Sequence, residues 1–362
     1  MLLIQDIFKQ YGHIYLEKYG EKMPSLHKKA LYAIINCRTK SLGGEVYYCN
    51  RCKQYHYSYH SCQNRHCVVC QNNDAGEWIE RQKKIMLPFT YFLATFTIPE
   101  ELRSLCRKNQ KRFYSILFKA SFNALKLLAK DEKYLGAEIG LIGILHTWTR
   151  AMIYHPHVHY LIPGGGIGNN GETVRFCDDD FLMHIKPLAI IFKAKFRDYL
   201  KREAPEIFNK ILANTWKRQW VVHIKPVGNG EKALEYMGKY LFRVAISNNR
   251  ILKLEKCKVT FRYSDYKTGK TKIVKLEVLE FIRRFLQHVL PHNFIKLRYY
   301  GFFAAASKQK LSKLTKMLYV DSIPENEQEN DQQLAKVLLC PICGSPLQWI
   351  KKLSKGCKDH VP

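Results

Sequence analysis

The sequence predicts an α+β protein, in which helices and short strands alternate along a chain of 362 residues. Three observations favour this class. The N-terminal segment carries apolar side chains at helical spacing, beginning with Ile4 and Ile7. Residues 89–98 form a Phe-, Tyr- and Thr-rich run that is typical of a strand, and residues 140–162 contain a pair of similar segments. Cysteine pairs near both ends of the chain flank this mixed core.

The remaining elements follow from local sequence patterns. We expect a second N-terminal helix over residues 25–36 and a charged helix over residues 74–87. Residues 99–130 begin with Pro-Glu and continue with a buried stripe, which predicts a long helix. The sequence Pro-Gly-Gly-Gly at residues 163–166 predicts a turn after the strand pair. Residues 321–333 are acidic and poor in apolar side chains, which is typical of a linker.

These elements predict four segments along the chain. Residues 1–85 form a helical and zinc-binding domain, and residues 86–315 form the main mixed domain. Residues 316–335 form the linker, and residues 336–362 form a small cysteine module that is a candidate second zinc site.

The charge of the chain favours a polyanionic partner. Lysine and arginine total 59 against 31 acidic residues, which gives a formal net charge of +28. Cationic side chains displace the counterions of a phosphate backbone, and the 22 tyrosines suit stacking on unpaired bases. A solvated basic surface is the alternative. The sequence has neither a signal-peptide pattern nor an apolar run long enough for a transmembrane helix, so we expect a cytoplasmic protein that does not enter membranes.

The strongest metal signal is a pair of Cys-x-x-Cys motifs, Cys49 with Cys52 and Cys67 with Cys70. Four thiolates fill a tetrahedral coordination sphere, so we expect one structural Zn²⁺ held by these residues. Other side chains in the same block are alternative ligands, or ligands of a second ion: His56, His60, Cys62 and His66.

A second, weaker zinc signal lies at the C-terminal end. Cys340 and Cys343 form a good half-site. Cys357 and His360 would complete it within the same segment, although they lie in a basic tail.

A different metal site is indicated by the segment Tyr154-His155-Pro156-His157-Val158-His159. Residues two apart on a strand share a face, so His157 and His159 would lie side by side and Val158 would point into the core. Two imidazoles and one further ligand can hold a divalent ion with positions open for a phosphate oxygen. Surface histidines are the alternative interpretation.

The candidate nucleophiles are Tyr236 and Tyr240, which lie one helical turn apart and so share a helix face. A phenol is a poor nucleophile at neutral pH unless a metal polarises its target and a cation such as Lys239 lies nearby. Two aromatic core residues are the alternative.

These motifs together resemble the HUH-type two-tyrosine transposases of the insertion-sequence-91 family. The resemblance spans most of the chain and is carried by five segments in order. They are residues 61–70, residues 145–159, residues 236–248, residues 259–266 and residues 281–291.

The resemblance implies a specific fold and activity. The main domain would be an HUH nuclease core, with a five-stranded antiparallel sheet, the His-x-His pair on its central strand and the tyrosine helix beside it. The protein would be a metal-dependent rolling-circle transposase that nicks and rejoins single-stranded DNA at element ends and target through a 5′-phosphotyrosine. The ion would be Mg²⁺ or Mn²⁺, and His146 and Glu235 are the two candidates for its third ligand.

The same resemblance implies partners and a location. The resemblance implies a prokaryotic cell, with the protein on the nucleoid when bound to DNA. The position and charge of the zinc block within residues 1–85 lead to the separate hypothesis that this domain recognises the transposon end. The cationic side chains expected to contact DNA are Lys239, Arg243, Arg283 and Arg284. A replication initiator or relaxase with the same chemistry, and a non-catalytic zinc-stabilised repressor, are the alternatives. The sequence leaves the oligomeric state open.

Overall fold

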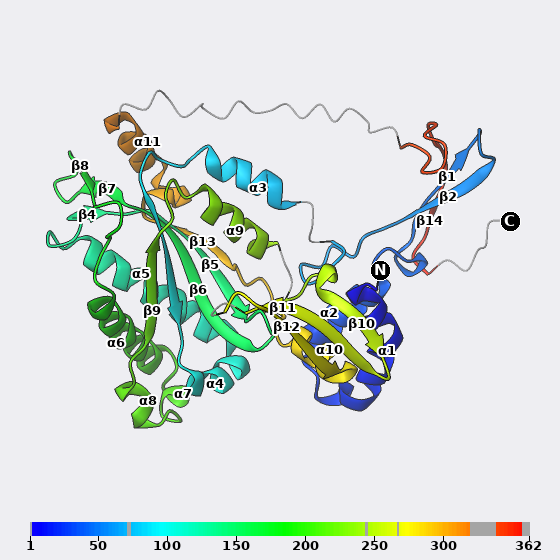
Figure 1. Cartoon of the computed structure of the whole chain (residues 1–362), viewed down its shortest axis with the longest axis horizontal. Helices are drawn as coiled ribbons and strands as arrows, with labels where there is room; N and C mark the ends of the chain where they lie inside the picture. Colours follow the sequence, from blue (N-terminus) through cyan, green and yellow to red (C-terminus); the bar gives the residue numbers. More distant parts are fainter. Residues whose placement is uncertain (1, 71–73, 243–244, 266–267, 319–337, 357–362) are drawn as a thin grey trace. The chain divides into compact units, whose positions relative to one another are not determined.

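A computed structural model describes residues 2–70, 74–242, 245–265, 268–318 and 338–356. The chain divides into two compact units (Figure 1). The first unit comprises Met1–Asn73, Ile246–Val289 and Pro324–Pro362, and the second comprises Asp74–Ala245 and Leu290–Ile323. Both contain helices and antiparallel strands, so the predicted α+β class is confirmed. No helix among the described residues is long and apolar enough to cross a membrane.

The second unit is built on a five-stranded antiparallel sheet with the order β13-β5-β6-β3-β9. Strand β6 is the central strand, and it carries His157 and His159. The strand bounds are β3 (Tyr91–Thr97), β5 (Leu141–Trp148), β6 (Tyr154–Pro163), β9 (Val221–Pro226) and β13 (Leu297–Tyr300).

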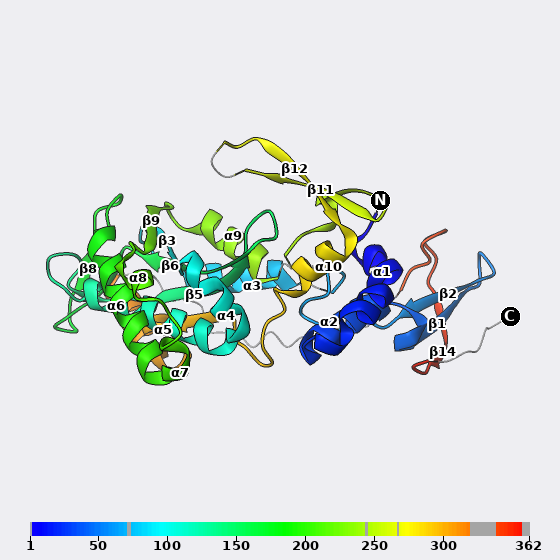
Figure 2. The same cartoon turned by 90° about the horizontal axis from the view of Figure 1, so that it is seen from below.

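Helices cover both faces of this sheet (Figure 2). Helices α5 (Gln110–Ala129) and α6 (Ile185–Glu203) pack together on one face. Helices α3 (Asp74–Lys83) and α9 (Glu231–Leu241) pack together on the other face. The sheet therefore lies between two helical layers, and most residues of its strands β5 and β6 are buried.

Strand alternation divides the sheet residues between these two layers. Phe96 on β3, with Val158 and Tyr160 on β6, joins the core cluster that includes the α5 and α6 side chains. Leu161 on β6 joins the other cluster, with Leu234 and other α9 side chains. His157 and His159 have the same parity as Leu161, so their side chains lie on the α9 face. The expectation that Val158 points into the core is confirmed.

Two sequence predictions in this unit are wrong in detail. The expected helix over residues 99–130 is broken near Asn109 into α4 (Arg103–Lys108) and α5. The expected turn at residues 163–166 instead leads into strand β7 (Gly165–Gly168), because a Cβ at Gly166 would lie 2.2 Å from the Glu138 carbonyl oxygen and only glycine lets the strands approach. The other elements are β4 (Ala137–Glu138), β8 (Val174–Phe176), α7 (Pro205–Phe208), α8 (Ala213–Lys217), α11 (Lys308–Met317), and the 3₁₀ turns η3 (Glu100–Leu102), η5 (Gly301–Phe303) and η6 (Ala305–Ser307).

The first unit combines two substructures. A helical part contains α1 (Ile4–Tyr19), α2 (Ser25–Asn36) and α10 (Val278–Leu286), next to the antiparallel sheet of β10 (Ile251–Glu255), β11 (Lys258–Ser264) and β12 (Thr271–Glu277). A second part is the hairpin β1 (Gly44–Cys49) and β2 (Gln54–Tyr59), which strand β14 (Gln348–Leu353) extends by pairing with β1. The 3₁₀ turns are η1 (Gly20–Lys22), η2 (Lys40–Leu42) and η4 (Asn248–Arg250).

These units do not coincide with the predicted segments. Residues 246–289 belong with the N-terminal helices, because Phe285 packs on Phe8 with ring centroids 5.0 Å apart and Asn248 Oδ1 accepts a hydrogen bond from Ile4 N. Helix α3 belongs to the second unit. The C-terminal segment is not a separate module, since β14 pairs with β1. Of the predicted linker, residues 316–317 lie in α11, and residues 319–335 lie outside the described part of the chain.

The packing of Tyr160 against β5 generates a stability prediction. Gly143 is the β-sheet partner of Tyr160, and a Cβ at Gly143 would lie 2.6 Å from the Tyr160 ring. The ring is fully buried and its hydroxyl bonds Ser121 Oγ at 2.8 Å, so it is not free to move. We expect Gly143→Ala to lower the free energy of unfolding by about 1–3 kcal/mol in urea titrations.

The matched control is Gly76→Ala in helix α3, where nothing lies within 4 Å of the added Cβ. That change should leave stability equal or raise it by up to about 1 kcal/mol, because alanine favours a helix. A Gly143→Ala protein as stable as the wild type would contradict this packing account.

Candidate functional site

Three histidines converge on the α9 face of the central sheet. His146 on β5 and His157 on β6 are direct antiparallel partners, and His159 lies two residues further along β6. One ring nitrogen of each of His146, His157 and His159 lies within 4.8 Å of the others. His146 is therefore the third member of the cluster that the His-x-His motif left incomplete. Glu235, the other candidate, is exposed on α9 and is not part of this cluster.

Hydrogen bonds occupy one nitrogen of each β6 histidine. His157 Nδ1 lies 2.6 Å from the His155 carbonyl oxygen, which can only accept, so Nδ1 carries the proton. His159 Nδ1 lies 2.8 Å from the hydroxyl of Thr95, its cross-strand neighbour on β3. Such contacts to the remote nitrogen orient metal-binding imidazoles and direct Nε2 toward an ion.

The His146 ring supplies the clearest sign that a group belongs in this cluster. His146 is 1% exposed, and its Nε2 atom is buried without a hydrogen-bond partner among the described residues. A buried polar atom without a partner is costly and unusual in a folded protein. A divalent ion held by the three imidazoles would satisfy this atom, so the residues present fit a metal.

The surroundings hold the three imidazoles in their neutral form. Burial lowers the pKa values of His146 and His157 well below the ordinary value, with a further contribution from neighbouring histidines. Burial, with Lys225 nearby, lowers the pKa of His159 to about 4. Because a histidine binds a metal through an unprotonated nitrogen, these rings are ready to act as ligands at neutral pH.

Both candidate tyrosines of α9 lie beside the histidines. The Tyr240 ring stacks on His146 with centroids 4.3 Å apart and planes inclined by 22°. The Tyr236 ring meets His159 edge-on at 5.9 Å, and the two tyrosine rings are 4.5 Å apart. The shared helix face predicted from their spacing thus faces the histidine cluster. The two environments differ, since Trp148 also stacks near Tyr240, at 6.3 Å.

The predicted DNA-contacting cations fall in several places. The Lys239 side chain and Arg243 lie outside the described parts of the structure. Arg283 and Arg284 lie on α10 of the first unit, where both form ion pairs with Glu280. The charges of Arg283 and Arg284 are therefore partly neutralised by an adjacent carboxylate.

His155 is half-buried beside His157, and burial lowers its pKa to about 4.

The cysteines form two four-sulfur clusters, both within the first unit. One contains Cys37, Cys62, Cys67 and Cys70, and the other contains Cys49, Cys52, Cys340 and Cys343. The predicted single site of Cys49, Cys52, Cys67 and Cys70 is therefore wrong. The two Cys-x-x-Cys pairs belong to different clusters, because β14 brings the C-terminal pair beside the β1–β2 hairpin.

The spacing of the sulfur atoms fits zinc. Cys37 and Cys62 Sγ lie 3.4 and 3.5 Å from Cys70 Sγ, and Cys49 Sγ lies 3.6 Å from Cys343 Sγ. A tetrahedral ion with zinc–sulfur bonds of about 2.3 Å separates its ligands by about 3.8 Å, far more than the roughly 2 Å of a disulfide. Four sulfurs leave no open position, which indicates structural sites.

The four alternative ligands predicted within the cysteine block differ in whether they belong to a cluster. Cys62 joins the first cluster, whereas His56, His60 and His66 belong to neither cluster among the described residues. His56 Nε2 instead lies 3.4 Å from Cys340 Sγ, as a hydrogen-bond partner. Cys357 and His360, predicted to complete the C-terminal site, lie outside the described residues.

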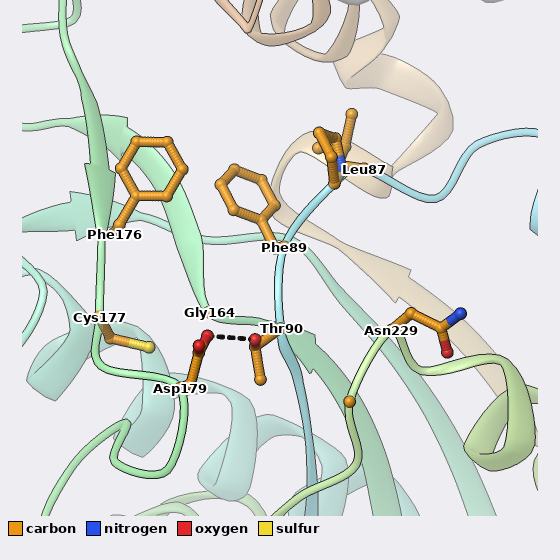
Figure 3. Close-up of a pocket in the computed structure, with 10 residues that line it drawn as sticks. Leu87, Phe89, Thr90, Gly164, Phe176, Cys177, Asp179 and Asn229 are labelled. Carbon is orange, nitrogen blue, oxygen red and sulfur yellow. Dashed lines mark hydrogen bonds between the residues drawn. The ribbon is translucent and has the colours of Figure 1, made fainter.

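A surface pocket of about 400 Å³ lies elsewhere on the second unit (Figure 3). It lies around Gly164, just beyond the end of β6, whereas His157 and His159 lie toward the beginning of that strand. Thr90 and Asp179 form a hydrogen bond across it. None of the predicted catalytic residues lines it, so the candidate site is the histidine–tyrosine face.

Sequence reasoning missed three participants in these sites. Thr95 lies in an ordinary strand, and only its register opposite His159 gives it a role. Trp148 follows His146 at the two-residue spacing that also flagged the His-x-His pair, so this signal was present in the sequence. Cys37 stands alone before the cysteine block, and no local spacing marks it as a ligand.

Two family models match the chain. Residues 140–310, which include the histidine cluster and both tyrosines, match the model described as "Putative transposase". Residues 7–98, which include six of the clustered cysteines, match the model described as "Transposase zinc-binding domain". The structural zinc sites indicated by the cysteine clusters agree with this second match. No solved structure matches the chain.

Curated relatives extend the similarity over most of the chain. It is 35% identical to the "Putative transposase y4qJ" of Sinorhizobium fredii over 334 residues, which are 87% of this chain and 84% of the relative. It is 25% identical to the "Transposase for insertion sequence element IS801" of Pseudomonas savastanoi over 95% of this chain and 87% of that protein. The chain belongs to the IS91 family of transposases.

Proposed function

We propose that this transposase is an HUH-type enzyme that cleaves and rejoins single-stranded DNA through a covalent tyrosine–DNA intermediate, in rolling-circle transposition. The observation that carries the proposal is the convergence of three neutral imidazoles and two tyrosines on one face of a sheet. A buried cluster of this kind has no packing advantage over apolar side chains, whereas metal-assisted phosphoryl transfer needs it. The bacterial cytoplasm, where such DNA lies, is the proposed location.

His146, His157 and His159 would hold the divalent ion, Mg²⁺ or Mn²⁺. When bound, this ion would act as a Lewis acid that polarises a phosphate oxygen of the DNA. The Thr95 hydroxyl and the His155 carbonyl contact Nδ1 of the two β6 histidines, which would leave their Nε2 atoms available to hold the ion. Lys225 and Lys296, whose charges lower the pKa values of His159 and His146, would attract the phosphate backbone.

In the cleavage step, the phenol oxygen of Tyr236 or Tyr240 forms a bond to the phosphorus, and the bond from phosphorus to the 3′ oxygen breaks. The phenol proton is lost and the departing 3′ oxygen gains one, so the products are a 5′-phosphotyrosine and a free 3′ hydroxyl. Rejoining reverses this exchange with a 3′ hydroxyl as nucleophile. The number of phosphoester bonds is conserved, so no external energy source is required.

Two tyrosines would permit two successive cleavages, at the element end and at the target. Their unequal surroundings support different roles, because Tyr240 is stacked on His146 whereas Tyr236 meets His159 edge-on. The two cysteine clusters would each hold one structural Zn²⁺ and stabilise the first unit, which we propose recognises the transposon end. Lys239, Arg243, Arg283 and Arg284 remain proposed DNA contacts.

The covalent intermediate is the direct test of this function. We expect incubation with labelled single-stranded DNA of the element end, plus Mg²⁺ or Mn²⁺, to give a protein–DNA band on a denaturing gel. The double variant Tyr236→Phe, Tyr240→Phe should lose the band, because it keeps both rings but removes both nucleophilic oxygens. His157→Ala should reduce it by at least about 100-fold.

Tyr134→Phe is the matched control, since Tyr134 packs against the core cluster on the other face of the sheet from His146, His157 and His159. It should form the band as the wild type does. If the double phenylalanine variant still forms the band, the nucleophile assignment is wrong.

The cysteine clusters generate a separate prediction. Purified protein should contain two zinc ions per chain by elemental analysis, and Cys340→Ser should contain about one. Because that variant loses one of the four sulfur ligands of the cluster that holds the C-terminal segment beside the β1–β2 hairpin, this segment should also become sensitive to limited proteolysis.

Cys177→Ser serves as the control, because Cys177 lies in neither cluster. Its zinc content should equal that of the wild type. A Cys340→Ser protein that retains both ions would contradict the joining of N- and C-terminal cysteines in one site.

A further inference from the structure

A groove in the first unit has chemistry that the proposed cleavage site does not use. It has a volume of about 650 Å³ and lies between helix α1 and the beginning of helix α10. The turn before β11 contributes Cys257, and the first turn of helix α2 contributes His27. We call this feature the tyrosine groove. Its volume is within the range of small-molecule binding sites and has room for a nucleoside.

Three tyrosines line the groove along one face of α1. Tyr11, Tyr15 and Tyr19 follow each other at four-residue intervals, so their side chains lie one above another on the helix. Tyr15 is nearly buried and supports Tyr19, with ring centroids 5.0 Å apart. Tyr19 is 43% exposed, and Ile14, which also lines the groove, is 38% exposed. The groove thus offers an open aromatic ring on a rigid support.

The unpaired charge of the groove is positive. Its two carboxylates are already matched, since Glu280 pairs with Arg283 and Arg284, and Glu277 pairs with Lys258. Lys18 and Lys22 form no ion pair with a carboxylate among the described residues. The Lys18 ammonium lies 5.5 Å from the centre of the Tyr19 ring. This ammonium lies over one face of the ring, so a base that stacks there would displace it toward the flanking phosphate.

We propose that the tyrosine groove binds single-stranded DNA, with one unpaired base stacked on Tyr19 and the flanking phosphates held by Lys18 and Lys22. This inference rests on the proposed function for the choice of single-stranded DNA, and it adds a binding site on a unit that carries neither catalytic tyrosine. A duplex offers phosphates but no free base face, so the groove would favour unpaired over paired DNA.

The test uses the full-length, zinc-loaded protein without added Mg²⁺ or Mn²⁺, so that binding is measured without cleavage. Fluorescence anisotropy gives Kd for a labelled 20-nucleotide oligothymidine and for a duplex of equal length. We expect Tyr19→Ala to weaken single-strand binding about tenfold and duplex binding less than twofold, because base stacking is lost. Tyr19→Phe keeps the ring and should bind the single strand within about twofold of wild type.

Tyr32→Ala is the matched control, because Tyr32 is 53% exposed on α2 and does not line the groove. It should leave both affinities unchanged. For single-strand binding, Lys18→Ala should reduce the magnitude of the slope of log Kd against log salt concentration by about 0.7. A second measurement locates the base directly: photo-crosslinking of an oligonucleotide containing 5-iodouracil, followed by mass spectrometry, should identify the peptide of α1 that contains Tyr19.

The proposal is overturned if Tyr19→Ala binds the single strand as tightly as wild type, or if the crosslinks map only outside the groove. Equal loss of duplex and single-strand affinity would also overturn it. Base binding in the groove does not involve Tyr236 or Tyr240. A negative result in the binding test would therefore be compatible with normal formation of the covalent intermediate. Conversely, a protein that never forms the intermediate would still show the Tyr19-dependent binding.

Discussion

The candidate active site depends on the pairing register between β5 and β6. His146 and His157 are cross-strand partners, so their rings emerge side by side on the same face of the sheet. A shift by one residue would turn one of the two strands over and send its histidine into the apolar layer beneath α5 and α6. The register is held by the residues that point the other way, among them Tyr160, whose ring lies over Gly143. The apolar packing on one face therefore determines the chemistry on the other.

The first unit depends on a different kind of constraint. Its segments lie far apart in the sequence, and its β1–β2–β14 sheet is small, with most residues of β2 and β14 exposed. Such a sheet buries too little apolar surface to be stable alone, and sulfur ligands from both ends of the chain meet beside it. Metal binding would thus replace the missing core. The tyrosine groove lies on the helical part of the same unit, where packing between α1 and α10 provides a rigid support.

Much of this organisation was predictable from local sequence. The alternation of residues along Tyr154–Pro163 predicted that His157 and His159 share a face, and the four-residue spacing of Tyr236 and Tyr240 predicted a common helix face.

The features that could not be predicted from the sequence depend on contacts between distant segments. The choice of His146 over Glu235 follows from strand register, and the division of the cysteines follows from the pairing of β14 with β1. The Cys-x-x-Cys spacing identifies half-sites but carries no information about which half-sites combine. The predicted boundary of the main domain differs from that of the second unit for the same reason, because no local sequence pattern indicates that α10 packs on α1.

The most direct test of the central claim is the number of histidine nitrogens bound to a divalent ion in the second unit. Pulsed electron paramagnetic resonance of Mn²⁺ added to the zinc-loaded protein counts nitrogen ligands through their hyperfine coupling. A metal site formed by His146, His157 and His159 predicts three histidine nitrogens in the wild type and two in His146→Asn, with unchanged coupling in Glu235→Gln. Mn²⁺ bound without nitrogen coupling, or three nitrogens retained in His146→Asn, would contradict it.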